Sequence, residues 1–396
     1  MARRSAAGSG SIRKKVVKRN GKEYVYWEAR YTEGTDPGTG RQIQRSVTGK
    51  TQKEVSQKLK AATASIDSGT YTSPNKMNLG QWLDIWASEY LGGVKPFTVA
   101  SYRGLIKNHI KPNLGAIRLD RLDAHTIQGF YNSLSRPQGE KPGISPKTIK
   151  NVHGVLHTAL KQAVLNGYLP FNPTDACKLP RIQRRELKPL DEEQTADFLR
   201  AIQGHRFEVL FTVTLFTGLR KGEVLGLTWD RVNFEDGTIL IDRQLQREKK
   251  KGGHYLFAPL KNDKSRLLTP APWVMKLLRE HRRKQDELHL KNAPYWVDDD
   301  FVFTNEIGEH LAEHTVYKDF KVIAASIGRP DARFHDLRHS YAVAALRSGD
   351  DVKTIQSNMG HATAAFTMDT YAHFTNQMRK DSAQHMNDYI DDILSR

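Results

Sequence analysis

The chain of 396 residues is longer than one hydrophobic core usually supports, so we expect two or three domains. Its formal net charge of +17 indicates a polyanionic partner, and residues 1–75 hold much of the excess, with 15 Lys and Arg against 6 Asp and Glu. The single cysteine, Cys177, excludes an internal disulfide, and no apolar run reaches the roughly 18 residues of a membrane span, so we expect a soluble intracellular protein.

Residues 1–70 are predicted to form a small domain of three β-strands and one helix, after a flexible basic arm rich in Gly, Ser and Ala. Three segments have the composition of strands: 12–17, 24–31 and 41–47. The last two flank a turn region rich in Gly and Pro, which predicts a hairpin. Thr51 and Glu54 have the spacing of a capping box, which predicts a helix that ends near Gly69.

Basic and aromatic residues are interleaved along these predicted strands. The basic residues are Arg30, Arg41 and Arg45, and the aromatic residues are Tyr24, Tyr26 and Trp27. Side chains alternate between the two faces of a strand, so we expect one face to pack on the helix through aromatic residues. The arginines on the other face are predicted to contact a DNA major groove.

A linker over residues 70–78 leads into a second predicted domain, residues 76–172, with four helical patterns. Apolar residues repeat at helical spacing from Leu79 to Tyr90, Tyr102 to Ile110, Ile127 to Leu134, and Ile149 to Ala163. The second pattern stops before Pro112, and the fourth begins at Ser145 and closes at Gly167. We interpret the apolar stripes as the core of a helical domain. Lysines off these stripes are predicted to meet phosphates: Lys107, Lys111, Lys147 and Lys150.

The stretch from 171 to 185 contains proline and several cations, including Arg184 and Arg185, as expected of a linker that crosses the DNA backbone. Asp191 and Gln194 then have the spacing of a capping box at the start of a third domain, residues 186–396. Strand-like runs follow at 238–242 and 255–258, and a turn over 261–265 is predicted to join the second run to a third at 267–269.

Two segments of the third domain carry candidate phosphate ligands. His335 and Arg338 are three residues apart in a predicted helix and therefore share a face. Arg220 follows Gly218, which permits a sharp turn, and Glu223 lies one helical turn beyond, within reach to orient the arginine. A guanidinium is a planar fork of donors that matches two phosphate oxygens, so a split arginine pair predicts a phosphodiester substrate.

The ordered motifs of this half of the chain are Arg220, His335-x-x-Arg338, Gly360-His361 and Tyr371. Together they resemble the active site of the tyrosine recombinases, the site-specific DNA integrases of temperate phages and conjugative transposons. The resemblance implies a mainly α, multidomain α+β protein with small antiparallel β elements and the tyrosine-recombinase catalytic fold. It also implies that the first domain binds arm-type DNA sites and the second binds the core site.

The resemblance further implies that Tyr371 attacks phosphorus, forms a 3′-phosphotyrosine and releases a 5′-hydroxyl, while Arg220 and Arg338 stabilise the transition state. The family's catalytic lysine, which protonates the leaving oxygen, corresponds to Lys261, with Lys264 as the alternative. The protein supplies the nucleophile and the ester keeps the bond energy, so no metal and no ATP are expected.

Four histidines near these motifs receive different predictions. His335 is expected to handle protons around the phenol or a nonbridging oxygen, and His361 to donate a hydrogen bond to the phosphate. His339 follows Arg338 directly, so it is expected to point to a different side of the helix and to support the fold. His373 is expected to have no role.

The last part of the chain carries apolar residues at helical spacing, from Met386 and Tyr389 to Ile390 and Leu394. The resemblance implies that such a helix is exchanged within a homo-tetramer on DNA, and docking on its own domain is the alternative. It also implies an excisionase, a host DNA-bending protein and a bacterial cytoplasmic location at the nucleoid. Two rival functions are a type IB topoisomerase-like activity and a catalytically silent DNA-binding regulator.

Overall fold

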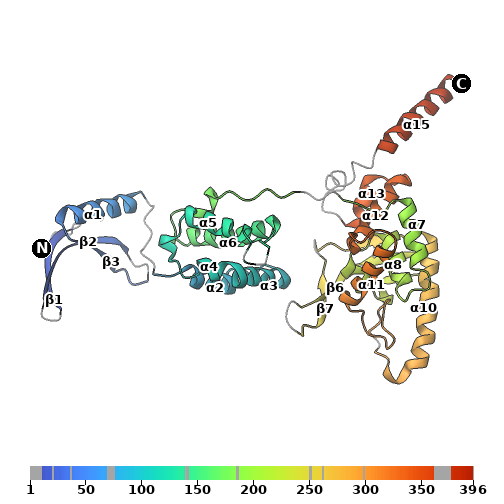
Figure 1. Ribbon diagram of the computed structural model, residues 1–396, viewed down its shortest axis with the longest axis horizontal. Helices are drawn as coiled ribbons and strands as arrows, with labels where there is room; N and C mark the ends of the chain where they lie inside the picture. The colour runs from blue at the N-terminus through green and yellow to red at the C-terminus, as the bar shows by residue number, and fades with distance from the viewer. Residues whose placement is uncertain are drawn as a thin grey trace. The chain divides into compact units, whose positions relative to one another are not determined.

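The computed structural model describes residues 11–19, 22–35, 38–68, 76–137, 139, 142–183, 187–248, 252–260, 263–297, 299–360 and 376–395. The chain divides into two compact units, residues 1–183 and 184–396 (Figure 1). Within the described residues, no helix combines the length and the apolar character that a membrane crossing requires.

The first unit begins with an antiparallel sheet in the order β1-β2-β3, and a helix packs on one of its faces (Figure 1). The elements are β1 (Ser11–Arg19), β2 (Lys22–Thr35), β3 (Gln42–Gly49) and α1 (Gln52–Asp67). The predicted strands and helix are confirmed. The Thr51 hydroxyl accepts from the Glu54 N–H (3.2 Å), but the Glu54 carboxylate accepts from the N–H of Lys50 (2.9 Å), one residue before the expected partner.

The two faces of this sheet differ from the predicted division into basic and aromatic sides. Ala29 and Tyr31 are buried, and a Cβ built on Gly49, opposite Trp27, would meet Val55 of α1 at 3.0 Å, so this face carries the helix. Tyr24, Tyr26 and Arg30 share the open face, because even-numbered residues of β2 point the same way. Arg45 pairs with Tyr31 in register and therefore lies on the helix side, where it binds Glu33 (2.6 Å).

The rest of the first unit is a helical bundle with its own core, drawn from residues 79–169. Its main helices are α2 (Leu79–Glu89), α3 (Pro96–Leu105), α4 (Lys111–Leu114), α5 (Ala124–Ser135) and α6 (Pro146–Leu165). The short helical segments are the π-helix η1 (Ile106–Ile110) and the 3-10 helices η2 (Leu119–Arg121) and η3 (Pro173–Ala176). The four predicted helical patterns are confirmed, and the Ser145 hydroxyl caps α6 as expected (3.2 Å to the Thr148 N–H).

One helix boundary in the bundle was predicted wrongly. The second helix does not stop before Pro112 but continues through α4. The π-helix η1 comes directly before it, and proline is tolerated in the first turn of a helix segment because the N–H it lacks has no partner there.

The second unit is a mixed domain of helices and two small antiparallel sheets, and the sheet of β6 and β7 lies at one edge of the unit (Figure 1). Its helices are α7 (Glu192–Ala201), α8 (Glu208–Thr217), α9 (Lys221–Leu225), α10 (Pro272–Asn292), α11 (Glu313–Ser326), α12 (Phe334–Arg347), α13 (Val352–Met359) and α15 (Asn376–Leu394), with turns η4 (Trp229–Arg231) and η5 (Ala293–Tyr295). Its strands are β4 (Val232–Asn233), β5 (Thr238–Ile241), β6 (Arg243–Arg247), β7 (Tyr255–Pro259) and β8 (Arg266–Leu268).

An aromatic cluster at the centre of this unit brings together four helices that are distant in sequence. Phe198, Phe211, Phe320 and Phe334 come from α7, α8, α11 and α12. The ring centroids of five of their pairs, all except Phe198 with Phe334, lie between 5.7 and 6.1 Å apart. Each such pair contributes about 0.5–1.5 kcal/mol beyond its burial. The cluster therefore fixes α8 against α12, the helices that lead into the arginine motifs.

The strand pairing in this unit corrects one prediction. The three strand-like runs are strands, but β7 does not pair with β8 across the turn between them. β7 pairs with β6, a strand that the sequence pattern did not predict, whereas β8 pairs with β5 in the order β4-β5-β8. The connection from Leu260 to Arg266 thus crosses from one sheet to the other, and Asp263 within it adopts a positive φ of 52°.

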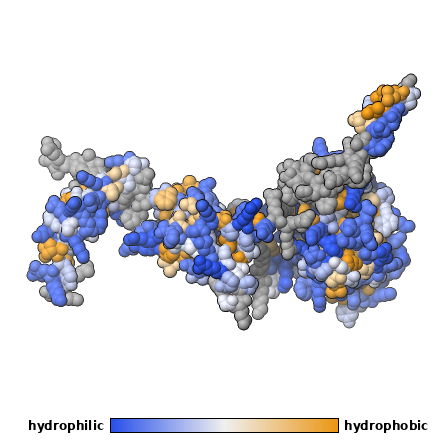
Figure 2. Space-filling view, turned by 45° about the horizontal axis from the view of Figure 1, so that its top comes forward, coloured by the Kyte–Doolittle hydropathy of each residue, from blue (hydrophilic) through white to orange (hydrophobic). Residues whose placement is uncertain are grey.

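The helix α15 confirms the predicted helical end of the chain. Apolar side chains are exposed on it: Met386, Tyr389, Ile390, Ile393 and Leu394. Figure 2 shows hydrophobic residues gathered along one side of the helix, with hydrophilic residues on the other.

Candidate active site

The turn between α8 and α9 places the first arginine. Gly218 caps α8 in the left-handed conformation (φ 65°), and a Cβ there would lie 2.4 Å from the Tyr341 ring of α12. Arg220 then precedes α9, and Glu223 in the first turn of that helix accepts from the Arg220 backbone N–H (2.9 Å) and from its Nη1 (2.7 Å). The predicted orienting role of Glu223 therefore has a matching geometry.

The second arginine is buried in α12, which begins at Phe334 and contains the predicted His335–Arg338 helical run. The Arg338 side chain is 1 % exposed, and it donates from Nη1 to the Gly218 carbonyl (2.5 Å) and from Nη2 to the Met359 carbonyl. A buried charge is costly unless it is hydrogen-bonded, and carbonyl oxygens are dipoles that bind cations without cancelling their charge. Arg338 therefore remains a net positive group inside the domain.

Three arginines meet at the end of α13, each on a different carbonyl. Arg266 donates from Nε to Asn358 (2.7 Å), Arg338 donates to Met359, and Arg220 donates from Nη2 to Gly360 (3.0 Å). The last carbonyls of a helix have no partner within the helix and carry its partial negative charge, so guanidinium groups are favourable ligands for them. Gly360 leaves the helix with φ 60°, just before His361.

Arg266 is a residue that sequence reasoning did not select. Its side chain is 7 % exposed and makes two bonds to Glu223, Nη2 to Oε2 at 2.7 Å and Nη1 to Oε1 at 3.1 Å. A signal was present, since Arg266 directly precedes the predicted run 267–269 and stands two residues before Leu268, which is buried on the same strand. Alternation can predict a buried arginine, but it cannot name the carboxylate that the arginine meets.

Glu223 is ionised in this environment. Burial by itself would raise the pKa of the Glu223 carboxyl, but the hydrogen bonds and charge of Arg266, followed by the charge of Arg220, lower it from 4.5 to about 2. The four groups Arg220, Arg266, Arg338 and Glu223 therefore carry two net positive charges. Such a site is suited to a polyanionic ligand.

His335 stands in the first turn of α12 with part of its surface exposed. Loss of hydration to the surrounding protein, and then the nearby groups His339, Arg338 and Arg220, lower the pKa of His335 to about 4. The imidazole is therefore neutral at pH 7 and able to accept a proton. His335 lies one helical turn before Arg338 on α12, which places its ring on the side of the helix that faces the site.

His339 was predicted to point to a different side of the helix than Arg338, and its ring lies against His335. The two rings meet edge to face with centroids 4.9 Å apart, because residues four apart lie on the same helix face. Burial lowers the pKa of His339 as well. His339 thus supports the His335 ring directly, from a different side of α12 than Arg338.

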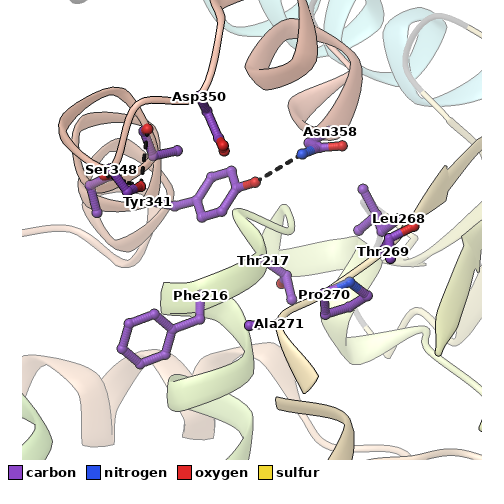
Figure 3. Close-up of a pocket in the computed structure, with 12 residues that line it drawn as sticks. Phe216, Thr217, Leu268, Thr269, Pro270, Ala271, Tyr341, Ser348, Asp350 and Asn358 are labelled. Carbon is purple, nitrogen blue, oxygen red and sulfur yellow. Dashed lines mark hydrogen bonds between the residues drawn. The ribbon is translucent and has the colours of Figure 1, made fainter. Parts of the chain in front are cut away.

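A cavity of about 400 Å³ lies beside the arginine site, between α8, β8 and α12 (Figure 3). Phe216, Pro270 and Tyr341 contribute apolar walls, and the Asn358 amide donates to the Tyr341 hydroxyl (3.2 Å). Burial raises the pKa of Tyr341, so its phenol is less easily ionised than that of an exposed tyrosine. Tyr341 is therefore a poor nucleophile and acts as a wall of the turn at Gly218.

Several predicted site residues lie outside the described residues: Lys261, His361, Tyr371, Arg184 and Arg185. His373, which was expected to have no role, lies outside them as well. The alternative lysine, Lys264, is described and exposed. Within the part of the chain that the structure describes, no three His, Cys, Asp or Glu side chains gather as metal ligands do.

The cations predicted to bind DNA have different surroundings. Arg30 lies on the open face of the sheet, 3.8 Å from Glu28, and Arg41 is exposed before β3. Of the four bundle lysines predicted to meet phosphates, three are exposed: Lys107, Lys147 and Lys150. Lys111 forms an ion pair with Asp84 (2.5 Å), and Arg45 pairs with Glu33 on the helix side of the sheet. These two carboxylates compensate charges that were predicted to meet DNA.

Two family models match the chain in separate stretches. The phage integrase family model matches residues 188–378, which contain the arginine site. A model described as the phage integrase N-terminal SAM-like domain matches residues 78–135, within the helical bundle.

Relatives align along nearly the full chain. The tyrosine recombinase XerC-like protein of Caldanaerobacter subterraneus subsp. tengcongensis is 30 % identical over 93 % of this chain and 97 % of its own length. The ICEBs1 integrase of Bacillus subtilis is 23 % identical over 91 % of this chain and 95 % of its own.

Solved structures share the fold. The Tn1549 transposon integrase, in complex with a circular intermediate DNA, gives a TM-score of 0.66 at 22 % identity and covers 78 % of this chain and 99 % of its own. A lambda integrase tetramer bound to a Holliday junction gives 0.54 at 19 % identity, with 88 % and 96 % covered. The predicted fold class, mainly α with small antiparallel sheets, is confirmed.

Proposed function

The chain belongs to the phage integrase family of tyrosine recombinases, and on that premise we propose how it cuts and rejoins DNA at specific sites. The observation that carries the proposal is the convergence of Arg220 and Arg338 on neighbouring carbonyls at the end of α13. The chain continues from there to His361 and Tyr371. This supports placing the scissile phosphate between the two guanidinium groups.

In the proposed reaction the Tyr371 phenol attacks the phosphorus of a phosphodiester held by Arg220 and Arg338. A bond forms between the phenolic oxygen and phosphorus, and the bond to the 5′-oxygen breaks, which leaves a 3′-phosphotyrosine. Lys261, or in its place Lys264, gives the proton that the 5′-oxygen needs. Attack by a 5′-hydroxyl of another strand reverses the step and rejoins the DNA.

The histidines have complementary roles in this proposal. His335 is neutral at pH 7 and accepts the proton of the attacking phenol, and His339 keeps its ring in place. His361 donates a hydrogen bond to a nonbridging oxygen. Two net positive charges in the site balance the negative charge that builds on phosphorus, and such electrostatic groups commonly supply the largest catalytic contribution. We propose that the reaction needs neither a metal ion nor ATP.

In this proposal three domains bind the DNA: residues 1–70, residues 76–172 and residues 186–396. Residues 1–70 bind arm-type sites through the open face of the sheet, with Arg30 and Arg41, and the bundle tracks the core site through its exposed lysines. Arg184 and Arg185 cross the backbone between them. Phosphate contacts of this kind add affinity without sequence information.

Assembly on DNA follows from the apolar side of α15. Five large apolar side chains exposed on one helix need a covering surface, and we propose that a neighbouring subunit supplies it within a homo-tetramer. The proposed setting is the bacterial cytoplasm, where the protein moves a phage or a conjugative element. An excisionase and a host DNA-bending protein are the proposed partners that set direction.

Covalent trapping tests this function. A suicide substrate carries a nick next to the scissile phosphate, so the released fragment diffuses away and the protein stays attached. Wild-type protein in EDTA is expected to trap, whereas Tyr371→Phe is expected to bind the same DNA and never to trap. Binding without trapping by the wild type would favour the silent regulator. Relaxation of a plasmid that lacks recombination sites, without recombinants from paired sites, would favour the topoisomerase.

A further inference from the structure

Arg266 has no role in the reaction described above, although it is buried against the group that orients Arg220. We propose that Arg266 is a positioning residue for strand cleavage, which neutralises Glu223 and holds the end of α13 so that Arg220 keeps its charge for the phosphate. This inference rests on the proposed function, because it assigns a role within the same reaction.

The contacts of Glu223 set the first step of the argument. This carboxylate is 1 % exposed and serves two guanidinium groups, Arg220 through Oε1 (2.7 Å) and Arg266 through both oxygens (2.7 and 3.1 Å). A buried carboxylate that lost one of two cationic partners would bind the other more strongly. Without Arg266, therefore, Glu223 would hold Arg220 in a closed ion pair.

Charge provides the second step. With Arg266 present, three guanidinium groups face one carboxylate, which leaves two positive charges. A phosphodiester carries one negative charge, and attack by a phenoxide brings a second. Removal of Arg266 leaves one positive charge against two negative ones at the transition state, whereas removal of Arg266 and Glu223 together restores two. The double substitution is thus matched to the wild type in charge.

The third step concerns the segment that leads to His361. Arg266 Nε binds the Asn358 carbonyl (2.7 Å), and a Cβ on Gly360 would lie 3.2 Å from Arg266 Nη1. Arg266 therefore packs against the last turn of α13 and against the glycine that ends it. The same side chain joins Glu223 of α9 to the end of α13, from which the chain continues toward the nucleophile. An arginine exposed on the surface would not make both contacts.

The test compares trapping rates on the nicked substrate for wild type, Arg266→Met, Glu223→Gln and the double variant. Arg266→Met is expected to bind DNA within about twofold of wild type but to trap about 10- to 100-fold more slowly, the loss typical of a residue that positions a group in direct contact with the reacting atoms. Adding Glu223→Gln to Arg266→Met is expected to raise the rate at least about fivefold, a coupling typical of residues in one network. A purely structural role predicts a double variant as slow as Arg266→Met or slower.

Controls separate the possible causes. Arg206→Met with Asp319→Asn makes the same pair of changes at an ion pair between the start of α8 and α11, and it is expected to trap at the wild-type rate. Thermal unfolding is measured for every variant. If Arg266→Met is unfolded, Arg266→Lys replaces it, and its trapping rate is expected to lie above that of the double variant Arg266→Met/Glu223→Gln.

The outcomes are distinct. Wild-type trapping together with unchanged trapping by Arg266→Met, or with no gain from the added Glu223→Gln, would overturn this inference and leave the proposed function standing. Absence of trapping by the wild type would overturn the proposed function instead.

Discussion

Arg220 donates from Nη2 to the carbonyl oxygen of Gly360 across 3.0 Å, although 140 residues separate them in the chain. This bond joins the turn that follows α8 to the end of α13, and the chemistry of the proposed reaction needs both. It leaves other N–H groups of the same guanidinium to bind phosphate, since an arginine has five.

Arg220→Ala is expected to lower the cleavage rate by about 100- to 1000-fold, because the phosphate loses one of its two forks at the transition state. Trapping on the nicked substrate measures the rate. Arg220→Lys keeps the charge but not the planar pair of donors, so its cleavage rate is expected to lie between those of the wild type and Arg220→Ala. Wild-type cleavage by Arg220→Ala would show that this arginine does not touch the reacting phosphate.

Gly218→Ala is expected to lower the free energy of unfolding of the second unit by about 3 kcal/mol. About 1 kcal/mol comes from the positive φ of 65°, and the rest from a Cβ placed 2.4 Å from the Tyr341 ring. Gly237→Ala is the matched control, because its φ is 66° and a Cβ there meets open space. Denaturant unfolding measures both, and equal losses would contradict the proposed contact with Tyr341.

Stability at acid pH is expected to depend on Glu223. Its folded pKa of about 2 lies below the ordinary 4.5, so its contribution is complete above pH 4.5 and disappears as the pH falls toward 2. Over this window the free energy of unfolding of the wild type is expected to fall by about 3 kcal/mol. Glu223→Gln is expected not to show this loss, because it has no carboxyl group at this position. Denaturant titrations of both proteins at several pH values give the difference. A difference that does not change with pH would mean that the carboxyl is not held ionised by the arginines.

Removal of residues 1–75 is expected to leave cleavage of core sites intact and to abolish binding to arm-type sites. The deleted part holds a net excess of cations, so the slope of log affinity against log salt should become shallower by about 0.9 for each phosphate that these cations neutralise in the full chain. Gel-shift titrations over a salt series compare the truncated and full chains. Unchanged arm-site binding would remove the DNA-binding assignment of the sheet.

The open face of that sheet shows how a local pattern can be right in part. Alternation predicted two different faces, and two faces exist, but Tyr24 and Tyr26 share the open one with Arg30. Arg45 lies on the helix side. Sequence composition cannot assign an arginine to a face until the register of the neighbouring strand is known, because a shift by one residue reverses every side chain.

What the sequence by itself determined is most of what depends on neighbours within a few turns: the helices of the bundle apart from one boundary, the caps at Ser145 and Asp191, the Arg220–Glu223 spacing and the His335–Arg338 helix. These features arise from hydrogen bonds and apolar periodicity over about 20 residues, and composition reports both.

Only the tertiary structure decided which strands pair across Leu260, that Asp84 compensates Lys111, and that Arg266 completes the site. Each of these depends on two segments brought together by a shared core, 27 residues apart for Lys111 and Asp84 and 43 for Arg266 and Glu223. The free energy that joins such segments comes from burial of apolar side chains elsewhere, so no local motif records the partner. For Lys111 and Asp84 this is the core of the bundle, and for Arg266 and Glu223 it is the core that contains Phe211.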